Sequence, residues 1–181
     1  MQRIIIIGCS GSGKSTLARE LGRRLGLPVT HLDRLHWQPG WQPHPDLAAF
    51  AAQIRAISEG ERWIIDGGYT TDNLEVRLAR ADTYILMDFP TWLCLCRVVW
   101  RAIKYFGQIR PDMAPGCPEG RLDLEFLNYT RRYKKHVLPR REAEIAQHFR
   151  GRLIRLRSTR DVDEFVRSIP EPSRDGIGSS E

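Results

Sequence analysis

The sequence of 181 residues contains no apolar run near the roughly 18 residues that a membrane-spanning helix needs. Residues 1–7, with four isoleucines, are too few and too poorly flanked to predict a signal peptide. We therefore expect a cytoplasmic protein without a membrane partner.

Cysteine is also scarce, and no two of the four cysteines have CxxC spacing. The pair Cys94 and Cys96, two residues apart on a predicted helix, point in different directions, so they do not suit a zinc site. Cys9 lies in a glycine-rich turn that a disulfide would distort. We expect reduced thiols and no structural zinc.

Acidic residues are few in one part of the chain. The formal net charge of +6 comes from residues 97–160, which hold sixteen basic and six acidic side chains. Such a segment can bind a nucleic-acid backbone or form a lid over a triphosphate. The sequence has no helix-turn-helix, zinc-finger or single-strand-binding motif, so nucleic acid is the weaker alternative.

The strongest motif is a phosphate loop of the pattern GxxxxGK[ST]. A β-branched strand, residues 3–7, precedes it, and a predicted helix from Thr16 to Leu21 follows it. The loop residues are Gly8, Cys9, Ser10, Gly11, Ser12, Gly13, Lys14 and Ser15. Backbone N–H groups of such a loop surround phosphates at a helix N-terminus. We expect Lys14 to contact the β and γ phosphates of ATP and Ser15 to ligate Mg²⁺.

Apolar strand patterns alternate with helical patterns along residues 1–169, which predicts one α/β domain with helices on both faces of a parallel sheet. The predicted strands are 3–7, 29–32, 63–66, 83–88 and 152–156, and the predicted helices follow Pro45, Pro90, Leu122 and Asp161. Residues 170–181, rich in Pro, Gly and Ser, are expected to form a flexible tail.

Three predicted strands are followed by acids: Asp33, Asp66 and Asp88. Ligands bind beyond the carboxyl ends of parallel strands, so we expect these acids to gather near the phosphate loop. A serine and one or two such acids would suffice for Mg²⁺, which keeps several water ligands.

The phosphate loop, Asp33, Asp66-Gly67 and the pair Arg97 and Arg101 resemble the adenylate-kinase-like P-loop kinases. Segments 31–41, 63–69 and 110–119 more closely resemble bacterial DNA topology modulation proteins, which are adenylate-kinase-related kinases. The resemblance implies a P-loop NTPase fold of the nucleoside-kinase type. Its sheet would have the strand order 2-3-1-4-5, and a helical lid would cover the site. It also implies a Mg²⁺-ATP-dependent kinase acting on a small molecule, with a nucleic-acid-associated protein as the alternative.

Carried over by position, the resemblance places Asp66 near the metal through water and Arg97 and Arg101 at the nucleotide. Arginines four residues apart share a helix face and can bind phosphate oxygens, although a solvated helix edge has the same pattern. Asp33 is either a general base for the acceptor hydroxyl or a cap of the following turn. Arg160, after the last strand, is expected to stack on the adenine.

Two acceptor-binding arginines of nucleoside monophosphate kinases are replaced here by His36 and Thr70. Their loss removes several charge-assisted hydrogen bonds, which argues against AMP and favours an acceptor with a neutral hydroxyl. We expect the acceptor region, about residues 33–58, to contribute Asp33, His36, Trp37, Trp41 and Tyr69. The two tryptophans either stack on the acceptor or hold their own loop in place.

Residues 107–121 interrupt the helical pattern and are predicted to form a lid that excludes water during phosphoryl transfer. Four arginines in or behind this segment are candidates for the transferring lid residue: Arg110, Arg121, Arg131 and Arg132. The sequence does not choose among them, nor between a monomer and a dimer.

Overall fold

A computed structural model describes residues 1–69, 74–120 and 123–171 of the chain. Two residues discussed above, Thr70 and Arg121, lie outside the described residues, as does most of the predicted tail, 172–181. Within the described ranges, no helix is long and apolar enough to cross a membrane.

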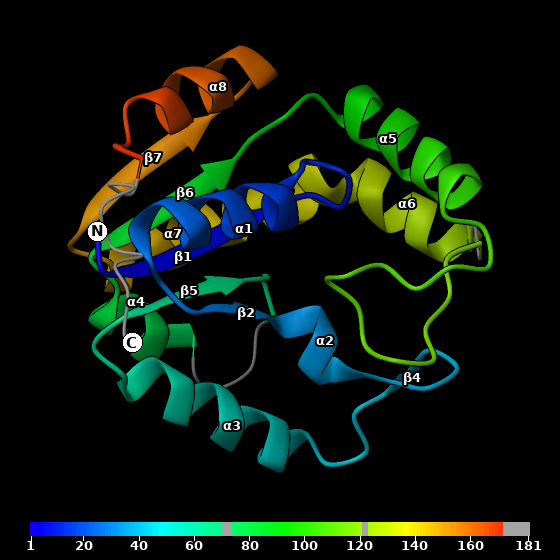
Figure 1. Ribbon diagram of the computed structural model, residues 1–181, viewed down its shortest axis with the longest axis horizontal. Helices are drawn as coiled ribbons and strands as arrows, with labels where there is room; N and C mark the ends of the chain where they lie inside the picture. Colours follow the sequence, from blue (N-terminus) through cyan, green and yellow to red (C-terminus); the bar gives the residue numbers. More distant parts are fainter. Residues whose placement is uncertain (70–73, 121–122, 172–181) are drawn as a thin grey trace, which may run out of the picture.

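The fold is built on a sheet of five parallel strands (Figure 1), as predicted. Along the chain the strands are β1 (Arg3–Gly8), β2 (Val29–His31), β5 (Trp63–Asp66), β6 (Thr83–Met87) and β7 (Arg152–Leu156). Across the sheet their order is β2-β5-β1-β6-β7, which is the predicted order 2-3-1-4-5. Strand β1 is therefore central, and it carries the phosphate loop at its carboxyl end.

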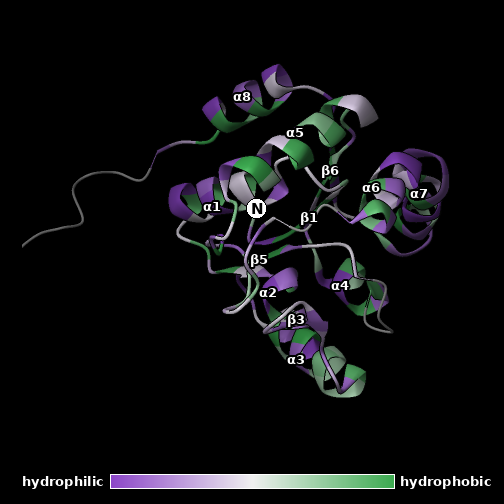
Figure 2. Ribbon diagram, turned by 90° about the vertical axis from the view of Figure 1, so that its right-hand side faces the viewer, coloured by the Kyte–Doolittle hydropathy of each residue, from purple (hydrophilic) through white to green (hydrophobic). Residues whose placement is uncertain are grey.

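Helices cover both faces of the sheet (Figure 2). One face holds α1 (Lys14–Leu25) and α8 (Thr159–Arg167), and the other holds α4 (Leu74–Arg80) and α7 (Leu138–His148). The central strand is a run of isoleucines, 4–7, that are all buried. Such a continuous apolar strand is typical of a parallel sheet covered on both sides.

Four further α-helices complete the described fold. They are α2 (Leu32–His36), α3 (Leu47–Glu59), α5 (Thr91–Lys104) and α6 (Leu124–Arg132). Helix α3 begins as predicted, because the Asp46 side chain accepts a hydrogen bond of 2.8 Å from the Ala49 N–H and so caps the helix.

Three local features were not predicted. Helix α2 ends the second strand one residue early, helix α4 follows the third strand, and the π-helix η1 (Tyr133–Val137) joins α6 to α7. Short α2 and α4 lack the long periodic pattern that identifies a helix in a sequence.

The predicted lid, described here through residue 120, contains no helix between α5 and α6. Three prolines and three glycines with positive φ, Gly107, Gly116 and Gly120, interrupt it. Beside it lies a ribbon of two antiparallel strands, β3 (Trp37–Gln38) and β4 (Gln42–Pro43).

Candidate active site

A cavity of about 1600 Å³ opens at the carboxyl end of the sheet, and most of the predicted site residues line it. The phosphate loop contributes Gly8 and residues 10–16. The other predicted residues on its wall are Asp33, Trp37, Trp41, Tyr69, Arg97 and Arg101. Donor and acceptor candidates therefore face one common space.

The phosphate loop has the backbone conformation that its glycines predict. Gly11 and Gly13 have φ values of 78° and 95°, which other residues rarely adopt. A Cβ on Gly11 would lie 2.4 Å from the Cys94 carbonyl oxygen, so helix α5 also excludes a side chain there. The Lys14 ammonium donates to the Cys9 carbonyl oxygen at 3.1 Å. Lys14 is thus held over the loop where a phosphate would bind.

Cys9 is a member of the loop but does not line the cavity with the others. Its side chain is buried, and its thiol faces the Thr130 carbonyl oxygen at 3.5 Å. A hydrogen bond with the neighbouring Cys94 thiol, followed by burial, raises the pKa of the Cys9 thiol. Cys9 can therefore contribute its backbone to a phosphate site, while its side chain packs in the interior.

Asp33 lies in the first turn of the short helix α2, which directly follows β2, and its side chain lines the cavity. The Tyr69 hydroxyl donates a hydrogen bond of 2.8 Å to Asp33 Oδ1. Burial, followed by the charge of Asp33 and this hydrogen bond, raises the pKa of Tyr69. Tyr69 is therefore a stable hydrogen-bond donor that orients the Asp33 carboxylate. Asp33 thus has a side-chain partner in the cavity that a mere cap of the following turn would not need.

The other two strand-end acids lie beside the start of the phosphate loop in the sheet register, but their side chains do not line the cavity. Asp66 is 4% exposed, contacts His31 Nδ1 at 2.8 Å and is absent from the cavity wall. Asp88 forms ion pairs with Lys134 at 2.9 Å and Arg155 at 3.4 Å and is likewise absent from the wall. The metal role assigned to Asp66 therefore gains no support from its position.

Arg97 and Arg101 both line the cavity, so they are not a solvated helix edge. Arg97 donates to Ser12 O at 3.4 Å and to Thr159 Oγ1 at 3.0 Å, and it lies over the Phe89 ring. Arg101 lies 3.3 Å from Glu119. Burial and the neighbouring Arg110 lower the pKa of Arg101, while nearby acids oppose that shift.

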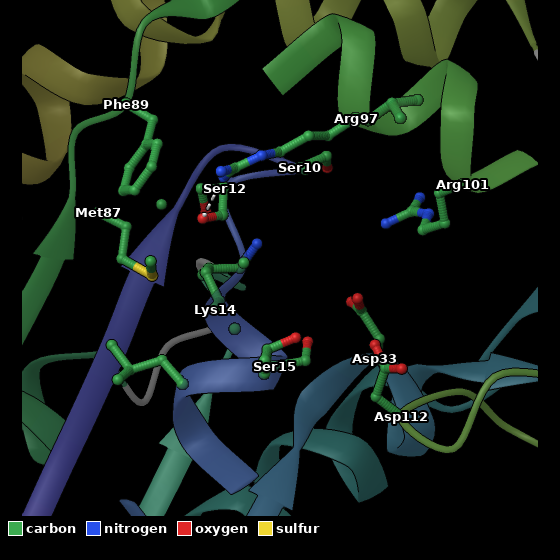
Figure 3. Close-up of a pocket in the computed structure, with 18 of the residues that line it drawn as sticks. Ser10, Ser12, Lys14, Ser15, Asp33, Met87, Phe89, Arg97, Arg101 and Asp112 are labelled. Atoms are coloured by element: carbon green, nitrogen blue, oxygen red, sulfur yellow. Dashed lines mark hydrogen bonds between the residues drawn. The ribbon is translucent and has the colours of Figure 1, made fainter. Parts of the chain in front are cut away.

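Asp112, an acid of the lid segment, lines the cavity, whereas Asp66 and Asp88 do not. Its carboxylate lies 2.6 Å from Arg110 and 3.6 Å from Arg19, and the Ser15 hydroxyl is also a hydrogen-bond partner. Burial raises its pKa, but Arg110, Ser15 and Arg19 outweigh burial and hold the pKa below its ordinary value. Figure 3 shows the carboxylates of Asp112 and Asp33 below Arg101, facing Lys14 and Ser15.

Of the three candidate lid arginines that the structure describes, Arg110 lines the cavity. Its guanidinium contacts Glu119 at 2.5 Å and Asp112 at 2.6 Å, and Glu119 also pairs with Arg101. Arg131 and Arg132 are exposed on α6 and do not line the cavity. The Glu119 carboxylate thus forms ion pairs with both Arg110 and Arg101.

The lid segment packs against the ribbon of β3 and β4, which carries Trp37 next to Trp41. Buried Met113, Ala114 and Cys117 pack against Trp37 and Trp41. The Cys117 thiol donates to the Gln38 carbonyl oxygen at 3.1 Å, and the Gly40 N–H donates to Gly116 O at 2.8 Å.

Trp41 has a φ of 63°, a strained conformation for a tryptophan that these surrounding contacts maintain. The tryptophans therefore contact the lid as well as the cavity.

Besides Cys9 and Asp66, two further predicted site residues do not line the cavity. His36 is absent from the cavity wall and packs among rings, with centroids 4.5 Å from Tyr69 and 5.2 Å from Phe50. The Arg160 side chain is 85% exposed and pairs with Glu164 at 2.7 Å, so it does not reach the cavity. Thr159, its neighbour, lines the cavity instead.

The sequence did not identify Asp112, Glu119, Arg141 or Glu144 as lining residues. Asp112 and Glu119 lie in the motif that supports the resemblance, and this motif was the available signal. Arg141 and Glu144 lie on α7 within a run of charged residues that is typical of a solvated helix, so no local signal distinguishes them.

Comparison with models of known protein families, and with curated protein sequences, finds no match. Solved structures share the fold. A gluconokinase from Sinorhizobium meliloti 1021 matches with a TM-score of 0.53 and 16% identity over 93% of this chain and 89% of its own.

Two shikimate kinases match similarly. The one from Acinetobacter baumannii, in complex with shikimate, has a TM-score of 0.58 and 13% identity over 93% of this chain and 90% of its own. The one from Bacteroides thetaiotaomicron has a TM-score of 0.54 and 18% identity over 92% of this chain and 95% of its own. At these low identities, the structural matches establish a shared fold and no more. They give no support to the narrower resemblance to DNA topology modulation proteins or to a nucleic-acid role.

Proposed function

We propose that this protein is a Mg²⁺-ATP-dependent kinase that transfers the γ-phosphoryl group to a hydroxyl of a small acceptor. One observation supports this more than any other. The phosphate loop and the Asp33–Tyr69 pair, which lie on different strands, face the same cavity. A phosphate donor and a hydroxyl acceptor can therefore meet in one space, as transfer requires.

The donor half of the cavity holds the triphosphate. The loop N–H groups surround the β phosphate, Lys14 contacts the β and γ phosphates, and Arg97 lies above Ser12 on the same side. Thr159 and Val162 of α8 line the end of the cavity beyond Arg97, where the adenine would lie.

The residues near Ser15 fit a magnesium ion. The Ser15 hydroxyl and the Asp112 carboxylate, which are hydrogen-bond partners, present hard oxygen atoms on one side of the cavity. The described residues contain no cluster of three or more His, Cys, Asp or Glu side chains suited to a metal. This agrees with Mg²⁺, whose shell is completed by water and phosphate. When bound, Mg²⁺ neutralises charge on the phosphates.

The acceptor half depends on Asp33. Tyr69 occupies Oδ1 of the carboxylate, and the remaining oxygen can take the proton from the attacking hydroxyl. Arg101 and Arg110 stabilise the charge that develops on the transferred group, and the lid excludes water. We propose Arg110 as the lid arginine of the reaction.

A hydroxyl acceptor, in place of the phosphate of AMP, also agrees with the absence of the two acceptor arginines of nucleoside monophosphate kinases. The structural neighbours are named as kinases of gluconate and shikimate, which supports a small metabolite as the acceptor. Relatedness to the adenylate kinases stays a proposal, and it rests on the sequence of the phosphate loop together with Asp33, Asp66-Gly67, Arg97 and Arg101.

The proposal is tested by measuring acceptor-dependent release of ADP with a panel of sugar acids, nucleosides and nucleoside monophosphates. At least one acceptor should raise turnover well above the rate with ATP alone. If every acceptor leaves the rate at that background while ATP binds normally, the kinase assignment is wrong.

A further inference from the structure

Two buried arginines lie at the turn that follows β5. Arg77 of α4 is 0% exposed and donates to the Tyr69 carbonyl oxygen at 2.5 Å. Arg141 of α7 is 6% exposed and donates to the Gly68 carbonyl oxygen. Two guanidinium groups from different helices thus converge on consecutive backbone carbonyls.

Among the residues described, only one of these two positive charges has a carboxylate partner. Arg141 forms an ion pair of 3.1 Å with Glu144, and Nε and NH1 of Arg77 are buried without a hydrogen-bond partner among the described residues. A third arginine, Arg140, is exposed on the same side of the cavity.

Burial, followed by the charge of Arg141, lowers the pKa of Arg77 to about 10. Glu144 and Tyr84 oppose this shift only in part. Buried cations are stabilised by an opposite charge, and a bound anion would supply one.

The cationic pair borders the cavity. Arg141, Glu144, Gly68 and Tyr69 line it directly, and Arg77 lies behind the turn. The π-helix η1 directly precedes α7, and π-helical turns are frequent at functional sites.

Tyr69 connects this pair to the reacting group. Its hydroxyl is bonded to Asp33, and its carbonyl oxygen is bonded to Arg77. The Asp33 carboxylate and the Arg77 guanidinium are therefore bonded to opposite ends of the same residue, Tyr69. A small molecule can contact the carboxylate and the cationic pair at once, with a hydroxyl at Asp33 and an anionic group at Arg141.

We propose that Arg141, supported by Arg77 behind the turn, binds an anionic group of the phosphate acceptor. The inference rests on the proposed kinase function and restricts its substrates to hydroxyl compounds that carry a carboxylate or a phosphate. The two arginines come from α4 and α7, whereas the positions of the nucleoside monophosphate kinase arginines hold His36 and Thr70.

Matched acceptor pairs that differ in one anionic group test this. D-gluconate against D-glucitol examines the carboxylate, and AMP against adenosine examines the phosphate. Binding is measured by calorimetry with Mg²⁺-ADP already in the phosphate loop, and turnover by ADP release. At least one anionic member should bind about ten- to hundredfold more tightly than its neutral partner. Whichever pair shows the preference identifies the anion.

Three variants separate recognition from folding. Arg141→Gln should raise the KM of the anionic acceptor about tenfold or more with little change in kcat, and it should leave the neutral partner unaffected. Glu144→Gln should shift the anionic KM the opposite way, because it removes the carboxylate that competes for Arg141. The control, Arg150→Gln, changes an exposed arginine off the cavity wall that donates to the Ala146 and Phe149 carbonyl oxygens. It should change neither value.

The outcomes distinguish this inference from the kinase assignment. If neutral and anionic members react equally and Arg141→Gln affects both alike, the anion site is overturned while the kinase function stands. If no acceptor reacts, the kinase function fails. The calorimetric preference and its loss in Arg141→Gln then still decide the anion site. Should Arg141→Gln not fold, the opposite shift in Glu144→Gln decides, and its absence overturns the inference.

Discussion

The Trp41 indole donates a hydrogen bond of 3.0 Å to the carbonyl oxygen of Pro118, which lies 77 residues further along the chain. This bond joins the ribbon next to the acceptor region to the lid segment. Together with the packing of Trp37 and Trp41 on Met113 and Cys117, it makes the ribbon and the lid neighbours in one layer over the cavity.

Trp41→Phe should loosen the lid without unfolding the domain. It removes one hydrogen bond, worth about 1 kcal/mol, but keeps an aromatic ring. Amide hydrogen exchange within residues 107–120 should accelerate about fivefold, notably at Gly107 and Glu119, whose backbone hydrogen bonds close the lid base. Trp92→Phe, at an exposed indole off the cavity wall, is the control. Equal exchange in both variants would contradict this role of Trp41.

Lys14→Ala should abolish most phosphoryl transfer. Removing one preorganised charge donor from a transition state costs about two to three orders of magnitude in kcat. The melting temperature should change little, because Lys14 lies at a half-buried position and contacts only the Cys9 carbonyl oxygen. The control is Lys135→Ala, an exposed lysine off the cavity wall. Wild-type turnover in Lys14→Ala would refute the phosphate-loop assignment.

Asp33→Asn should lower kcat by about two orders of magnitude or more while the acceptor still binds, because an amide cannot accept the hydroxyl proton. Tyr69→Phe is the companion variant: it keeps the carboxylate but removes the 2.8 Å hydrogen bond that orients it, so its loss should be smaller. Steady-state kinetics on both variants measure this. Unchanged turnover in Asp33→Asn would exclude Asp33 as the base.

Arg97→Ala and Arg160→Ala should differ, although the sequence assigned both arginines to the nucleotide. Arg97 lines the cavity and contacts Ser12 and Thr159, so its loss should weaken binding of ATP about tenfold or more. Arg160 is exposed and pairs with Glu164, so its loss should leave the Kd for ATP unchanged. Calorimetric titration with Mg²⁺-ATP measures both, and weaker binding in Arg160→Ala would restore its predicted role.

The stability of the acceptor region should depend on pH through His36. Its burial lowers the pKa below the ordinary value of 6.5, and the charge of Asp33 opposes this shift only in part. The unfolded chain then binds the proton more readily than the folded one. Neutral His36 contributes full stability above pH 6.5, and this contribution is lost as the pH falls through the lowered pKa.

Denaturant unfolding of the wild type and of His36→Gln between pH 5 and 8 measures this contribution. The difference in unfolding free energy between the two proteins should shrink toward low pH. A constant difference across that range would show that His36 does not titrate within the fold.

Local patterns predicted the strands and the phosphate loop because the features that define them are local. The isoleucine run before Gly8 and the glycines that permit positive φ lie within a dozen residues. Strands β5 and β7 have the predicted bounds, Trp63–Asp66 and Arg152–Leu156. Helix α4 was missed because seven residues are too few to show a period of 3.6.

The strand-end acids show where local reasoning failed. Asp66 and Asp88 do follow strands of the parallel sheet, as predicted, but His31, Lys134 and Arg155 hold their side chains away from the cavity. The direction of a side chain depends on partners that lie far away in the sequence. The position of an acid at a strand end therefore predicts which part of the fold it lies in, but not which groups its side chain contacts.

The sequence by itself determined the phosphate-binding half of the protein: the strands of the parallel sheet, the loop from Gly8 to Ser15, and the placing of Arg97 and Arg101 on one face. Only the tertiary structure decided the other half. It brought Asp112 of the lid to Ser15 and Arg141 of α7 to the turn at Gly68. The physical reason is range, because a backbone conformation is set by adjacent residues, whereas an ion pair or a buried cation is set by the packing of the whole chain.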